Sequence, residues 1–254
     1  MKPQLPRNRS QPNFDRVAHL YRWAEYLSLG PILQRTRVHF LPQLSECRST
    51  FVLGDGDGRF LARLLAQNPS LHALAIDTSA TMLELLQHRC AAASSRLRLQ
   101  QASALTAAPP YDVDLIVTHF FLDCLTQAEV NELANRIATQ AQPETLWLLS
   151  DFRVPQSGAV RPLARLYIRA LYFAFRLLTG LRVQRLPDPQ AALAHAGFKR
   201  IAQHERLFGI IYTELWQREK TSDDPDRHYA QIPILYNREQ QTTQPVRAAD
   251  HPLI

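Results

Sequence analysis

From about residue 46 the chain alternates between two hydrophobic patterns. Short apolar runs of the kind that form buried strands lie at 50–54, 71–77, 96–102, 112–122 and 144–152. Amphipathic segments with helical spacing lie between them, at 59–67, 79–93 and 126–140. This alternation is typical of a mostly parallel sheet that is covered by helices on both faces. We therefore predict an α/β domain of the doubly wound, Rossmann-like type over residues 46–218.

The pattern changes near the end of this domain. Residues 187–198 form a short amphipathic segment that ends at Gly197. Segments 199–208 and 210–218 then alternate in the manner of strands, and Gly209 between them favours a tight turn. The sequence thus predicts that an antiparallel hairpin closes the otherwise parallel sheet.

The flanking segments have other patterns. Residues 13–45 carry apolar side chains at helical spacing, interrupted at Gly30 and Pro31, which predicts an N-terminal helical cap. Residues 1–12 and 219–254 are polar and contain prolines, so we predict a disordered lead and a mostly disordered tail.

Composition adds limits on the class of protein. The 254-residue chain carries 29 Lys+Arg against 23 Asp+Glu, a net charge of +6, which favours anionic partners. Its three cysteines, Cys47, Cys90 and Cys124, are too far apart for a zinc site and odd in number for a disulfide framework. The N-terminus lacks the apolar core of a signal peptide. These features predict a cytoplasmic protein that binds no metal.

A glycine turn follows the first predicted strand, with the sequence Gly54-Asp55-Gly56-Asp57-Gly58. It does not satisfy the dinucleotide fingerprint G-x-G-x-x-G, because arginine or leucine stands where the third glycine is required. Two carboxylates also disfavour a pyrophosphate at a helix N-terminus. A cationic cofactor without phosphate, such as S-adenosylmethionine, is compatible with them.

Asp77 ends the second predicted strand, 23 residues after Gly54. A carboxylate at this place can accept hydrogen bonds from both hydroxyls of a ribose. The alternative is that Asp77 caps the helix that begins near Ser79, and the two roles are compatible.

These motifs together resemble class I S-adenosylmethionine-dependent methyltransferases. The likeness rests on the order of elements, the G-x-G-x-G turn, the acid at the end of the second strand and the closing hairpin. The layout of residues 13–30 and 160–215 is similar to the ubiquinone/menaquinone C-methyltransferase group. Two positions where that superfamily usually has acids carry Val52 and Ser103 instead. The resemblance implies S-adenosylmethionine as cofactor, bound by Gly54, Asp55, Gly56, Asp57, Gly58, Asp77, Thr78, Ser103 and His119.

The ends of the fourth and fifth strands supply candidates for the acceptor side. His119 is a candidate general base, and Asp123 either orients it or takes the proton itself. The alternative is structural, with His119 as a strand-end residue and Asp123 as a helix cap. Asp151 and Arg153 are candidates for substrate contact. No G-x-S-x-G elbow occurs, which argues against a serine hydrolase.

An arginine-rich helix is predicted at about 160–181, in an interval without acidic residues. Arg161, Arg165, Arg169 and Arg176 share one face, and leucines and aromatic residues cover much of the rest. We consider a lid helix with a solvated basic face, a helix that lies on a membrane surface, and capture of an anionic substrate. Nucleic acid is the least favoured partner. Phe14, Tyr21 and Tyr26 are further lid candidates, with a role in the core as the alternative.

The predicted function is methyl transfer from S-adenosylmethionine to a small, lipophilic acceptor. One alternative is a protein that binds S-adenosylmethionine without turnover, suggested by the residues at positions 52 and 103. The other is a nicotinamide-dependent oxidoreductase, against which the failed fingerprint and the hairpin count. The sequence does not identify the acceptor or the methylated atom.

Overall fold

The computed structural model describes residues 29–155, 158, 161–179 and 185–220. The predicted N-terminal helix before residue 29, with Phe14, Tyr21 and Tyr26, lies outside these residues. The tail beyond residue 220 does so as well, and the interpretations of both ends stay predictions.

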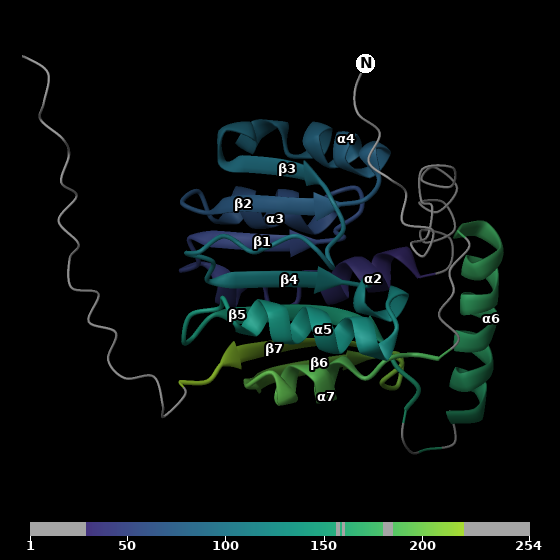
Figure 1. Ribbon diagram of the computed structural model, residues 1–254. Helices are drawn as coiled ribbons and strands as arrows, with labels where there is room; N and C mark the ends of the chain where they lie inside the picture. Colours follow the sequence, from purple (N-terminus) through teal and green to yellow (C-terminus); the bar gives the residue numbers. More distant parts are fainter. Residues whose placement is uncertain (1–28, 156–157, 159–160, 180–184, 221–254) are drawn as a thin grey trace, which may run out of the picture. The chain divides into compact units, whose positions relative to one another are not determined.

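A seven-stranded sheet forms the centre of the fold, in the order β3-β2-β1-β4-β5-β7-β6. The pairings among β1 to β5 are parallel, whereas β7 pairs antiparallel with both β5 and β6 (Figure 1). The predicted mixed sheet with a closing hairpin is therefore confirmed. The strands are β1 (Ser49–Leu53), β2 (His72–Asp77), β3 (Leu97–Gln101), β4 (Leu115–His119), β5 (Leu146–Phe152), β6 (Phe198–Arg206) and β7 (Ile211–Arg218).

Helices cover both faces of this sheet. The apolar sides of α5 and α7 join one core cluster, and those of α3 and α4 join a second cluster on the opposite face. The helical elements are α2 (Gly30–Arg37), η1 (Leu41–Leu44), α3 (Arg59–Gln67), α4 (Ala80–Arg89), η2 (Ala91–Arg96), η3 (Leu122–Cys124), α5 (Gln127–Ala138), α6 (Arg161–Thr179) and α7 (Pro189–His195).

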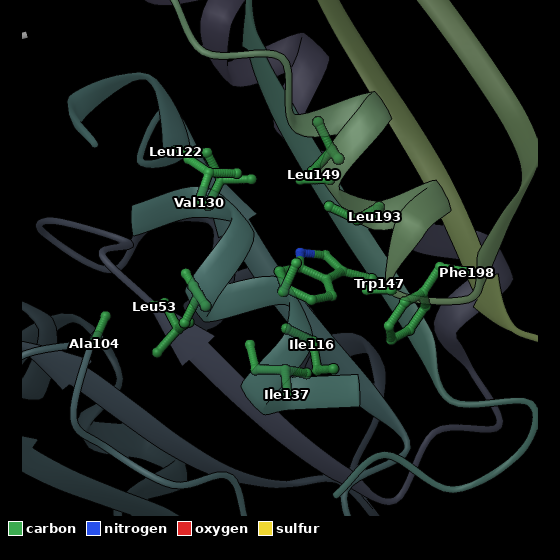
Figure 2. Close-up of a cluster of buried hydrophobic side chains, with 14 of the residues drawn as sticks. Leu53, Ala104, Ile116, Leu122, Val130, Ile137, Trp147, Leu149, Leu193 and Phe198 are labelled. Carbon is green, nitrogen blue, oxygen red and sulfur yellow. The ribbon is translucent and has the colours of Figure 1, made fainter. Parts of the chain in front are cut away.

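Trp147 lies at the centre of the first core cluster, and Figure 2 shows apolar side chains from several elements around it. Its side chain is fully buried, and its indole N–H donates to Thr118 Oγ1 at 2.9 Å. The ring of Phe198 meets it edge-on, with ring centroids 5.5 Å apart. Successive residues of a strand face opposite sides of the sheet. At the end of β4, Thr118 therefore faces the first cluster, and the next residue, His119, faces the other cluster.

Local signals explain where the elements begin and end. Thr126 caps α5, and its side chain and that of Glu129 form the capping box that the spacing predicts. The turn between β6 and β7 places Gly209 at φ +84°, a conformation that favours glycine. β4 is shorter than its apolar run, because Phe120 takes a left-handed φ of 52° directly after the strand. The chain then turns into η3, which brings Asp123 to the edge of the sheet.

Candidate active site

The glycine turn joins β1 to α3 at the carboxyl edge of the sheet. Its three glycines have φ values of 68°, 59° and 76°, which L residues rarely adopt. A side chain at Gly54 would collide with the ring of Phe121, and one at Gly58 would lie 2.7 Å from Leu86 Cγ. At Gly56 no atom lies within 4 Å of the Cβ position. The middle of the turn therefore faces open space, as a ligand cradle requires.

The two aspartates of the turn have partners within the protein. Asp55 Oδ2 accepts from the backbone N–H of Leu61 at 3.0 Å and so caps the first turn of α3. Asp57 Oδ2 pairs with Arg59 Nε at 3.0 Å and with an Arg89 nitrogen at 2.9 Å. These contacts give the negative charges a structural role that the sequence interpretation did not include. A further contact of either carboxylate with a cofactor stays a prediction.

Asp77 stands beside the turn, because β1 and β2 are neighbours with Leu53 opposite Ile76. Its Oδ1 accepts from the Ser79 backbone N–H at 2.9 Å. Ser79 itself is the N-cap of α4, so the capping role considered for Asp77 belongs to Ser79. The half-buried Asp77 carboxyl thus ends its strand, as predicted for a group that contacts ribose.

The end of β3 completes this side of the edge. Gln101 pairs with Asp77 across the two strands, and its side chain donates to the backbone carbonyl of Thr78 at 3.1 Å. Ser103 follows two residues later, and its hydroxyl accepts from the backbone N–H of Leu105 at 3.2 Å. The glycine turn, Asp77, Thr78 and Ser103 are therefore brought together along the ends of three adjacent strands.

His119, at the end of β4, belongs to a buried hydrogen-bond relay on the face covered by α3. Thr213 donates to the Leu149 carbonyl at 3.0 Å, and Ser150 donates to Thr213 Oγ1 at 2.9 Å. Ser150 Oγ is then left to accept from His119 Nδ1–H, at 2.9 Å. Ser150, rather than Asp123, orients the imidazole.

The relay fixes the histidine tautomer and leaves Nε2 with a lone pair. Within the described residues this atom is buried and has no hydrogen-bond partner, and the ring meets Phe60 edge-on at 4.4 Å. Burial lowers the pKa of His119 well below its ordinary value, and the charge of Arg37 lowers it further. His119 is therefore neutral, and its free nitrogen is enclosed.

A pair of buried carboxyls occupies the opposite face at the same edge. Asp151, in β5, accepts from two backbone N–H groups, that of Asp123 at 3.1 Å and that of Phe152 at 2.9 Å. Tyr172, from α6, donates its hydroxyl to Asp123 Oδ2 at 2.7 Å. Both carboxyls are buried, although Asp151 lies near the end of β5 and Asp123 lies in η3 beside it.

The surroundings of this pair disfavour the ionised form of both carboxyls. Burial raises the pKa of Asp123, and burial together with the charge of Asp123 raises that of Asp151 well above its ordinary value. Burial also raises the pKa of the Cys124 thiol, and the charges of Asp123, Asp151 and Asp77 add to the effect. The charge of Asp77 thus acts on the Cys124 thiol, which follows Asp123 in the chain.

The chain is similar to known methyltransferases in one segment of its sequence and in its fold. Residues 51–146, from β1 to the first residue of β5, match the family model described as "Methyltransferase domain". This segment is therefore similar to a methyltransferase domain, and the sheet that contains it has the fold of class I methyltransferases. S-adenosylmethionine is the cofactor that this type of domain implies. No curated protein sequence matches the chain.

Solved methyltransferase structures share the fold at low sequence identity. The mitomycin 7-O-methyltransferase MmcR is 16% identical with a TM-score of 0.61, over 81% of this chain and 60% of that one. The S-adenosylmethionine-dependent methyltransferase SibL is 18% identical with a TM-score of 0.58, over 86% and 64%. The N-methyltransferase NodS from Bradyrhizobium japonicum is 12% identical with a TM-score of 0.52, over 74% and 98%. The chain thus spans less than two thirds of the length of the first two.

Arg153, Arg165 and Arg169 are the remaining residues predicted for substrate contact or the lid. Arg153 donates to the Gly209 carbonyl, pairs with Glu205 and lies over the ring of Tyr212, so its guanidinium holds the β6–β7 turn. Arg165 and Arg169 are exposed on α6. None of the helices in the described ranges is both long enough and apolar enough to cross a bilayer.

Tyr172 is the residue near the site that sequence reasoning missed. It follows the buried positions Ala164 and Ile168 at intervals of four, which places all three on the inner face of α6. This spacing was the available signal. It indicates which face of the helix is covered, but it does not identify the carboxylate that the hydroxyl reaches.

Proposed function

We propose that this chain transfers a methyl group from S-adenosylmethionine to a small, lipophilic acceptor at the carboxyl edge of β1, β4 and β5. The observation that carries the proposal is that the glycine turn and the carboxyl pair are linked by one short segment at this edge. Phe121 packs against Gly54 of the glycine turn, and two residues later Asp123 joins the carboxyl pair. The methyltransferase domain match covers Gly54, Phe121 and Asp123.

Several features of the edge fit the cofactor. The open position at Gly56 leaves room for a ligand close to the backbone, and the position of Asp77 at the end of β2 supports a role for its carboxylate as acceptor from ribose hydroxyls. Thr78 directly follows β2, and Ser103 follows β3 by two residues, at the same edge of the sheet. When bound, S-adenosylmethionine supplies a methyl group on a positively charged sulfur, which a nucleophile attacks directly.

The carboxyl pair supports an acceptor whose reacting atom carries a hydrogen. Asp123 already accepts a hydrogen bond from the phenolic hydroxyl of Tyr172, so it can accept one from a donor group of similar polarity. A raised pKa brings a carboxylate closer to the value that proton transfer near neutral pH requires. Phe120, Phe152 and Leu171 form an apolar cluster at this end of the domain, which supports a lipophilic acceptor.

Calorimetric titration with S-adenosylmethionine and S-adenosylhomocysteine tests the cofactor assignment. Asp77→Asn is expected to weaken both affinities by about tenfold or more, because a charge-assisted hydrogen bond contributes about 1.5–3 kcal/mol. Asp112→Asn, at an exposed position, is the matched control and is expected to bind as the wild type does. Absence of binding of either compound to the wild type would overturn the proposed function.

A further inference from the structure

The two faces of α6 have different surroundings. Ala164 and Ile168 are buried on its inner side, where Tyr172 contacts Asp123. On its outer side Leu163 and Leu166 are each 65% exposed, and Pro162 and Ala170 are exposed beside them. A helix on the surface of a soluble domain normally turns polar side chains outward. The outer face of α6 therefore has an apolar centre that the described part of the protein leaves uncovered.

A row of positive charge borders this apolar centre. Arg161, Arg165 and Arg169 follow one another at intervals of four, so they form a line along one side of the helix, and all three are exposed. The sequence has no Asp or Glu from position 152 to 187. The ion pairs found among the described residues involve none of these three arginines. Nothing on the helix itself neutralises the row.

Exposed leucines beside a row of arginines suit the interface of an anionic bilayer. The arginines would contact lipid phosphates and the leucines would enter the boundary between headgroups and acyl chains. A second copy of the chain fits less well, because a twofold interface through this face would bring the two rows of arginine together. A nucleic acid would pair with the arginines but would leave the leucines in contact with water.

We infer that the exposed side of α6, with Leu163 and Leu166 at its apolar centre and Arg161, Arg165 and Arg169 along its edge, docks the protein on an anionic membrane surface. Docking through this face leaves the inner face of the helix, with Tyr172, turned toward the candidate acceptor site. The contact is peripheral and does not depend on methyl transfer, so it can be tested with the protein alone.

Co-sedimentation of the full chain with vesicles tests this docking. Phosphatidylcholine vesicles that contain phosphatidylglycerol are compared with vesicles of phosphatidylcholine alone, at low and at high salt. The wild type is expected to sediment with the anionic vesicles and to be released by salt. Each of Arg165→Gln and Arg169→Gln should lower the vesicle affinity about fivefold. Leu163→Ser and Leu166→Ser should each lower it about tenfold.

The matched control is the double variant Arg63→Gln with Ile201→Ser, which removes an exposed arginine of α3 and an exposed apolar side chain of β6. It is expected to sediment as the wild type does. Circular dichroism checks that each variant is folded, which the exposure of these positions favours. The inference is overturned if the wild type stays in the supernatant with anionic vesicles, or if the α6 variants and the control bind equally. It is also overturned if Leu166→Ser instead abolishes a dimer seen without vesicles.

Discussion

Two buried titratable groups lie at the same edge of the sheet, on opposite faces, and they differ in what can reach them. His119 is held by Ser150 and Thr213, and Phe60 packs against its ring, so its free nitrogen meets no donor among the described residues. Asp123 is reached by a hydroxyl from another element, Tyr172 of α6. Burial perturbs the pKa of both groups. A perturbed pKa is therefore found for an enclosed group as well as for a reactive one. Whether a hydrogen-bond donor can reach the group distinguishes the two cases.

The largest expected effect is on the rate of methyl transfer, where substitution of Asp123 and of His119 should give different results. Asp123→Asn should lower kcat by about 100-fold or more, because it removes a proton acceptor at the acceptor side. His119→Asn keeps a donor toward Ser150 and removes the Nε2 lone pair, and it should change kcat far less. The measurement is transfer from labelled S-adenosylmethionine, with cofactor affinity as the check on folding. A greater loss in His119→Asn than in Asp123→Asn would reverse the comparison.

The same comparison shows what the sequence could predict. Apolar periodicity located β1 to β5 and helices α3 to α5, since each depends on neighbours a few residues apart. The capping box at Thr126 and the turn at Gly209 are local as well, and both are confirmed. The glycine turn followed by Asp77 indicated the cofactor edge, because β1 and β2 are consecutive strands that pair in the sheet.

The contacts within the site depend on pairs that are distant in sequence. Asp57 meets Arg89, His119 meets Ser150, and Asp123 meets Tyr172, at separations of 32, 31 and 49 residues. The types of side chain do not indicate which of these distant residues are in contact. His119 and Asp123, for example, are close in sequence and yet face opposite sides of the sheet. The residue type identified the candidates, and strand alternation and helix packing decided their partners.

Asp151, the other carboxyl of the pair, and His119 have pKa values that are shifted in opposite directions, and the second prediction depends on this difference. The folded pKa of Asp151 is raised, so its contribution to stability is present below about pH 4 and is lost as pH rises toward the folded value. The folded pKa of His119 is lowered, so its contribution is present above about pH 6.5 and is lost as pH falls toward the folded value.

Urea unfolding between pH 4 and pH 8 measures both effects. Asp151→Asn should reduce the loss of unfolding free energy on the alkaline side, and His119→Asn should reduce the loss on the acid side. Asp112→Asn, which is exposed, should keep the wild-type profile. Parallel profiles for the wild type and Asp151→Asn would show that this carboxyl ionises as it does in the unfolded chain.

The smallest expected effect concerns the Tyr172 hydroxyl. It tests whether a donor group of the acceptor can reach Asp123. Tyr172→Phe keeps the packing of the ring and removes one hydrogen bond to a carboxyl, so the free energy of unfolding should fall by about 1 kcal/mol. If the hydroxyl occupies the place of the acceptor's donor group, its removal frees Asp123. The acceptor KM should then fall while kcat changes little. A tyrosine that only anchors α6 would instead leave KM unchanged or raise it, and Asp123 would then be as enclosed as His119.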